Sequence, residues 1–218
     1  MTRDGIYNNA YIIIPLFIFW CIGISILITN EKGNEVLYLA QHRIGFFDFL
    51  FSSITQLAEL PVYALVIGIL YISNKKEKAY TILAAGLIST LVSYLLKEFF
   101  QEPRPLLYFN QIGLLNTLKP VPGVSLNSGN SSYPSGHTMG AFTLFITLAL
   151  LWPSQRVFGI FCVIMAILVG VSRIYLGQHF LSDVVSGSMV GVYLSAFSYY
   201  FIYKNIRNRK QKQQMHIQ

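Results

Sequence analysis

The stretch SRIYLGQHFLSD, residues 172–183, lies between two strongly apolar runs at 157–171 and 184–203. Ionisable side chains inside or beside a membrane are costly, so the three found here indicate a functional site. His179 and Asp183 are four residues apart and would share one face of a helix, if a helix has begun by then. A carboxylate bonded to one imidazole nitrogen leaves the other nitrogen as a nucleophile or base. The alternative for this stretch alone is a loop at the membrane surface with an Asp that starts a helix.

The composition places the sequence among membrane proteins. Of its 218 residues, 54% are hydrophobic and only 11% are charged, which is too apolar for an ordinary soluble domain. A net charge of +7 would suggest nucleic acid as the partner of a soluble protein, but these charges lie between apolar runs, so no nucleic-acid partner is expected. Cys21 and Cys162 both lie inside apolar runs and predict neither a disulfide nor a metal site.

Six apolar runs near bilayer length predict an all-α, polytopic membrane protein with six transmembrane helices. We expect one integral-membrane domain over residues 1–218, with a basic cytoplasmic tail at 204–218. A further, interfacial helix is expected in the first outer loop at 35–47, where apolar residues partly follow helical spacing. The six runs cover residues 10–29, 53–72, 80–96, 138–152, 157–171 and 184–203.

The distribution of Lys and Arg among the loops predicts the orientation in the membrane. Ten of the 16 basic residues would lie on the side that carries both termini, and six on the other side. The side with ten should be cytoplasmic, so both termini are expected inside and residues 172–183 outside. The first run is expected to be a retained anchor, because no small-residue cleavage pattern follows it.

A second polar segment follows the third apolar run. It begins with Lys97 and ends with Arg104, which is bracketed by Pro103 and Pro105 so that a helix cannot easily continue there. The alternative is a Lys that extends its stem along an apolar surface, followed by a solvated loop Arg. In either case two cations lie at the outer end of the third run.

A third polar segment, YPSGH at 133–137, directly precedes the fourth apolar run. Ser135 and Gly136 fall where a helix N-terminus would present unpaired N–H groups, which is a ready site for an anion. Gly136 would let that anion approach the backbone closely. The alternative is an ordinary Ser cap followed by an exposed His137.

These three segments would bring several cations and two imidazoles to one face of the membrane. Three cations around one point repel a metal ion and attract a tetrahedral dianion, and the guanidinium of Arg173 is suited to a phosphate. His137, His179 and Asp183 could in principle ligate a metal, but the neighbouring cations favour a phosphoryl site. The residues expected at it are Lys97, Arg104, Ser135, Gly136, His137, Arg173, His179 and Asp183.

Together the segments resemble the three-part signature of the type 2 phosphatidic acid phosphatase family. The match consists of K-x6-R-P at 97–105, P-S-G-H at 134–137 and S-R-x5-H-x3-D at 172–183. It covers a minority of the chain, but three matches in this order and at these spacings are specific. In size and hydropathy the chain is similar to the outer-leaflet and periplasmic lipid phosphatases of bacteria.

The resemblance implies a role for each of these residues. His179 would attack phosphorus and become a phosphohistidine, with Asp183 orienting its ring. His137 would protonate the leaving oxygen and then activate water. No metal and no cofactor are expected. The remaining site residues would bind the non-bridging phosphate oxygens, namely Lys97, Arg104, Ser135, Gly136 and Arg173.

The expected function is therefore a metal-independent lipid phosphatase of the plasma membrane, in bacteria the inner membrane, with its site facing the periplasm or the outside. The expected partners are membrane lipids and a phosphorylated lipid substrate. Undecaprenyl pyrophosphate, phosphatidylglycerol phosphate, phosphatidic acid and lipid A phosphate are all candidates. Two alternatives stay open. One is a transporter or scramblase of a phosphorylated lipid, and the other is an enzyme like the vanadium-dependent haloperoxidases, which share this anion pocket.

Overall fold

The computed structural model describes residues 9–215, and within this range every regular element is a helix. The all-α class is therefore as predicted. The chain termini, which were expected to be cytoplasmic, lie outside the described residues. The elements in chain order are α2 (Ala10–Thr29), α3 (Asn34–Gln41), α4 (Gly45–Ile54), η1 (Thr55–Ala58), α5 (Leu60–Ile72), α6 (Lys76–Phe100), α7 (Pro105–Gln111), η2 (Leu115–Thr117), α8 (Gly136–Leu151), α9 (Arg156–Tyr175), α10 (Leu181–Phe197), the π-helical η3 (Ser198–Tyr203) and α11 (Lys204–Met215).

Helix α8 is the centre of the bundle, because most of its side chains are buried and it packs against α6, α9 and α10. Two glycines of α10 permit the closest of these approaches. A Cβ atom at Gly187 would lie 2.7 Å from the carbonyl oxygen of Ser135, and one at Gly191 would lie 2.7 Å from that of Met139. Small residues at such spacing let two helix backbones meet. Gly187 and Gly191 therefore allow the start of α10 to pack closely against the start of α8.

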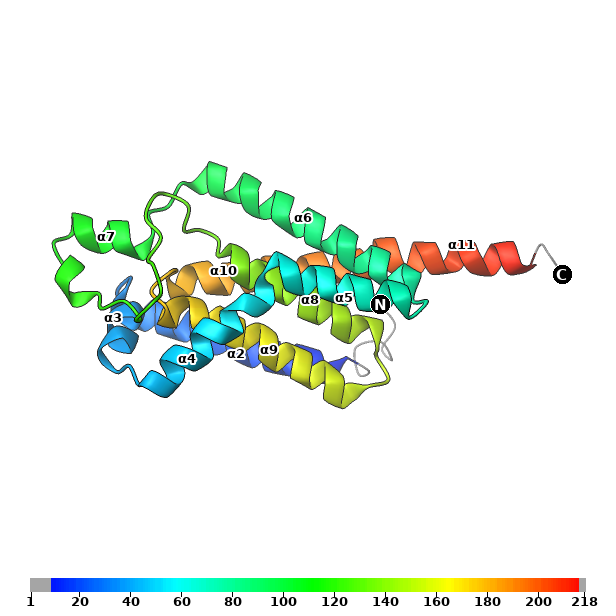
Figure 1. Ribbon diagram of the computed structural model, residues 1–218, viewed down its shortest axis with the longest axis horizontal. Coiled ribbons are helices and arrows are strands. Elements are labelled where there is room, and N and C mark those ends of the chain that lie inside the picture. Colours follow the sequence, from blue (N-terminus) through cyan, green and yellow to red (C-terminus); the bar gives the residue numbers. More distant parts are fainter. Residues whose placement is uncertain (1–8, 216–218) are drawn as a thin grey trace.

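Four helical segments within the described residues are long and apolar enough to cross a membrane, namely Ala10–Thr29, Lys76–Gln111, Arg156–Tyr175 and Leu181–Arg209. Helix α8, with 16 residues, is shorter. Figure 1 shows that α2 begins, and α11 projects from the bundle, at the end opposite to α3 and α7. The loops that carry the three polar segments lie at the α3 and α7 end (Figure 1).

The second apolar run, 53–72, is not one straight helix. The segments Gly45–Ala58 and Leu60–Ile72 meet at Glu59 with a bend of 56°. Pro61 lies at the start of α5 and has no N–H to continue a helix from the preceding turn. The apolar composition predicted a span here but not this break.

The helix expected at 35–47 is two helices. Helix α3 ends at Gln41 and α4 begins at Gly45, with Ile44 in an extended conformation between them. Arg43, which lies between the two helices, donates a hydrogen bond of 2.9 Å from Nη2 to the carbonyl oxygen of Tyr175. This contact with the end of α9 holds the break in place.

Candidate active site

His179 and Asp183 meet, although not as two residues on one helix face. Helix α9 ends at Tyr175, and Gly177, with a φ of +66°, turns the chain in the left-handed conformation that glycine adopts most readily. Helix α10 begins only at Leu181. The carboxylate of Asp183 bends back to accept a hydrogen bond of 3.0 Å from the N–H of Phe180, and it lies 3.4 Å from Nδ1 of His179.

Both side chains of this pair are buried, with His179 1% and Asp183 2% exposed. Burial lowers the pKa of His179 to about 4, with the charges of Arg173 and Arg104 acting in the same direction and Asp183 opposing them. The imidazole is therefore neutral at neutral pH. A carboxylate facing Nδ1 favours the tautomer with its proton on that atom, so the lone pair is on Nε2.

Helix α8 begins directly after Ser135, as its sequence predicted. The hydroxyl of Ser135 accepts hydrogen bonds from the N–H of Thr138 at 3.4 Å and from its hydroxyl at 2.9 Å. The N–H of Ser135 donates to the carbonyl oxygen of Asp183 at 3.0 Å. A Cβ atom added at Gly136 would lie 3.4 Å from Nζ of Lys97. The Lys97 ammonium thus lies at the N-terminus of α8, where an anion would be favoured.

The two arginines are buried, with Arg104 7% and Arg173 5% exposed. Arg104 donates from Nε to the Ser131 hydroxyl at 3.2 Å and from Nη1 to the carbonyl oxygen of Gln178 at 3.4 Å. Arg173 donates from Nη1 to the Thr55 hydroxyl at 2.7 Å, while its Nε is a buried donor without a partner in the described residues. An oxyanion is the natural partner for such a donor.

His137 connects the three segments, since it lies within electrostatic range of Arg173, His179, Lys97 and Arg104. The structure therefore brings together all the residues that the sequence predicted for the site. Within residues 9–215 there is no group of three or more His, Cys, Asp or Glu side chains that could hold a metal ion. A site with this charge is suited to a phosphate.

Comparison with known proteins agrees with this geometry. The sequence profile of the PAP2 superfamily matches residues 78–207, which contain all three polar segments. The chain belongs to the PAP2 superfamily. It is an integral membrane protein and a hydrolase of the phosphatase class, and the resemblance noted in the sequence is confirmed.

Two proteins of Bacillus subtilis match most of this PAP2 chain. Undecaprenyl-diphosphatase BcrC is 28% identical over 173 residues, which are 78% of this chain and 82% of BcrC. Phosphatidylglycerophosphatase B is 25% identical over 197 residues, which are 83% of this chain and 90% of the relative. Among solved structures, LpxE of Aquifex aeolicus is 27% identical, with a TM-score of 0.63 over 75% of this chain and 92% of LpxE.

Ser132, a buried residue of this PAP2 site, was not predicted from the sequence. It is 0% exposed, its hydroxyl donates to Oδ2 of Asp183 at 2.5 Å, and it lies 3.5 Å from Nδ1 of His179. Its N–H donates to the carbonyl oxygen of Glu102 at 3.0 Å, which joins two of the three segments. Its place immediately before the YPSGH segment was the available signal in the sequence.

The turn at η1 was not predicted from the sequence either. Thr55, which binds Arg173, lies in this 3-10 turn. Glu59 follows it, with Oε1 3.9 Å from Nε2 of His137. Both fall inside an apolar run, and only the bend at Glu59 brings them to the site, so a reading of composition alone could not find them.

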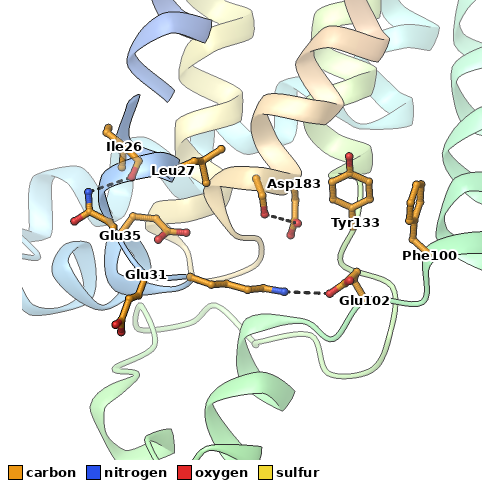
Figure 2. Close-up of a pocket in the computed structure, with 11 residues that line it drawn as sticks. Ile26, Leu27, Glu31, Glu35, Phe100, Glu102, Tyr133 and Asp183 are labelled. Carbon is orange, nitrogen blue, oxygen red and sulfur yellow. Dashed lines mark hydrogen bonds and ion pairs between the residues drawn. The ribbon is translucent and has the colours of Figure 1, made fainter. Parts of the chain in front are cut away.

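Two hollows adjoin the site. One, of about 350 Å³, borders Asp183 and Ser182 and carries Glu31, Glu35 and Glu102 on its walls, with an ion pair of 3.0 Å between Lys32 and Glu102 (Figure 2). Its carboxylates would repel a phosphate. The other, an apolar groove of about 930 Å³ between α5 and α6, reaches Lys97 and Gly136. The groove therefore opens on the cationic part of the PAP2 site.

Proposed function

We propose that this PAP2 protein is a lipid phosphatase that cleaves a phosphomonoester or pyrophosphate headgroup through a phosphohistidine intermediate. The observation that carries the proposal is the buried pair of His179 and Asp183, with the imidazole neutral and cations from all three segments around it. A neutral imidazole is a nucleophile, and surrounding cations stabilise the charge that develops on a phosphoryl group.

In the first step Nε2 of His179 forms a bond to phosphorus as the bond from phosphorus to the leaving oxygen breaks. Asp183 stabilises the positive charge that develops on the ring. His137 gives a proton to the leaving oxygen, so that the lipid departs as an alcohol or a phosphate.

In the second step His137, now neutral, takes a proton from water as the water oxygen bonds to phosphorus. The bond from phosphorus to Nε2 breaks, and inorganic phosphate is released. The Lys97, Arg104 and Arg173 side chains bind the non-bridging oxygens in both steps, together with Ser135 and Gly136 at the start of α8. No step in this sequence uses a metal.

The apolar groove between α5 and α6 supports a lipid as the substrate. Its walls are apolar along most of their length, and Lys97 lies at the end next to α8. A hydrocarbon chain in the groove would place its phosphate beside the ammonium. The relatives are named for undecaprenyl diphosphate, phosphatidylglycerophosphate and lipid A, and we propose that the substrate belongs to this group of lipids or is phosphatidic acid.

We further propose six transmembrane segments in a single domain, counting the bent pair and α8 as spans beside the four long ones. The start of α2 and the basic helix α11 lie at one end of the bundle and the site at the other (Figure 1). The excess of Lys and Arg at the α11 end supports a cytoplasmic location for it. The site then faces the periplasm or the outside of the plasma membrane.

Release of phosphate by the purified protein from a panel of these lipids tests the proposal. We expect His179→Ala to abolish release, with a loss of at least about 10³-fold, while the variant still inserts into membranes. A ³²P-labelled substrate should leave acid-labile label on the wild type but not on the variant. Retained turnover by the variant would remove the nucleophile assignment, and lipid movement without phosphate release would favour a transporter.

A further inference from the structure

Glu59 is an ionisable residue in the middle of an apolar run, where a carboxylate is costly unless it serves a purpose. It lies at the bend between η1 and α5 in an extended conformation, with φ −88° and ψ 161°. As the residue before the first turn of α5 it could have capped that helix, but its side chain forms no cap hydrogen bond. Helix capping therefore does not explain why a carboxylate lies at this position.

The carboxylate of Glu59 faces the site. Its Oε1 lies 3.9 Å from Nε2 of His137, an ion-pair distance that is too long for a direct hydrogen bond. It is also close enough to Arg173 to act on the charge of that guanidinium. The side chains of His137 and Glu59 are 37% and 49% exposed, so a water molecule or a small movement can join them.

The charges around His137 make this contact significant. Burial and the positive charges of Arg173, Lys97 and Arg104 all disfavour the protonated form of its ring. An acid that protonates an alkoxide leaving group must nevertheless carry its proton when the bond to phosphorus breaks. A carboxylate beside Nε2 stabilises the imidazolium form and opposes the effects of burial and of the three cations.

We propose that Glu59 is a positioning residue that keeps His137 protonated for departure of the leaving group. In this role the imidazolium gives one N–H proton to the leaving oxygen, becomes neutral, and recovers a proton from the attacking water in the second step. Glu59 stays ionised throughout and forms no bond to the substrate. This role rests on the proposed function of His137 and extends the site to a fourth segment, the turn at 55–59.

The dependence of the rate on the leaving group tests the role of Glu59. Two phosphomonoesters with the same alkyl chain are compared, one releasing an aliphatic alcohol and one releasing a nitrophenol, which departs without protonation. We expect Glu59→Gln to lower kcat for the alkyl ester about tenfold or more, because general acid catalysis typically contributes 10²–10⁴-fold. The loss for the nitrophenyl ester should be less than about threefold.

Matched variants separate this role from a structural one. Glu31→Gln, at an exposed carboxylate away from His137, should change neither rate, and Glu59→Asp should recover part of the loss. Equal losses on both esters with Glu59→Gln, or no loss on either, would overturn the proposal. If Glu59→Gln does not fold, Glu59→Ser introduces a favoured cap residue for α5, removes the carboxylate and answers the same question.

His137→Ala, measured on the same two esters, distinguishes the failure of this inference from the failure of the proposed function. If His137→Ala shows the leaving-group dependence and Glu59→Gln does not, only the role of Glu59 is wrong. If His137→Ala loses nothing on the alkyl ester, the proposed function of His137 is wrong, and the role of Glu59 is wrong with it.

Discussion

Ser132 fixes the carboxylate that orients the proposed nucleophile. Its hydroxyl and the N–H of Phe180 both donate to Oδ2 of Asp183, at 2.5 and 3.0 Å, beside Nδ1 of His179. A hydrogen bond to a charged group contributes about 1.5–3 kcal/mol. We therefore expect Ser132→Ala to lower kcat by roughly tenfold or more with little change in KM. Ser128→Ala, in the exposed part of the same loop, is the control, and a wild-type kcat for Ser132→Ala would contradict this role.

The buried His179 also predicts how stability depends on pH. Its pKa is lowered from 6.5 to about 4 in the folded protein, so between these values the unfolded chain binds a proton that the folded chain does not. Stability should therefore fall as the pH drops through this window, by on the order of 2 kcal/mol between pH 7 and pH 5. Denaturant unfolding in detergent at both pH values measures this change. His179→Gln, which has no titrating group at this position, should lose correspondingly less, and an equal loss in both proteins would contradict the lowered pKa.

At the scale of the elements, the apolar runs predicted where most helices lie, and local chemistry predicted some of their ends. Ser135 marked the start of α8 because a Ser cap has a recognisable sequence context. The break at Glu59 was not predicted, although Pro61 follows it, because residues 53–72 are apolar on both sides of the bend and contain no charge cluster. The break between α3 and α4 was missed because it depends on Arg43 bonding to α9, a contact between residues far apart in sequence.

At the scale of the whole molecule, the three polar segments could be assigned to one site because each carries a chemically unusual motif at the same end of the predicted helices. The supporting residues could not be assigned in this way. Thr55 and Ser132 are common polar residues whose function comes from their partners Arg173 and Asp183. These pairings exist only once α8, α9, α10 and the turn at η1 have packed together, and no local pattern encodes them.

The groove between α5 and α6 gives the last prediction. Gly68 lines this groove, and a Cβ atom added there would meet nothing within 4 Å. A Phe side chain at this position would extend into the groove, while an Ala would leave most of it open and would slightly favour the helix. Because a misplacement of about 1 Å can cost 10²-fold in rate, a long lipid chain displaced from the groove should no longer bring its phosphate to Lys97.

We therefore expect Gly68→Phe to lower kcat/KM for a long-chain lipid phosphate about tenfold or more, while hydrolysis of a short-chain, water-soluble phosphate stays within about twofold of the wild type. Gly68→Ala should behave as the wild type on both substrates. Phosphate release from the two substrates, measured in the same detergent, gives the ratio directly. An equal loss on both would mean that the substitution disturbs the fold or the site, and no loss on the long-chain lipid would mean that the hydrocarbon lies elsewhere on the bundle.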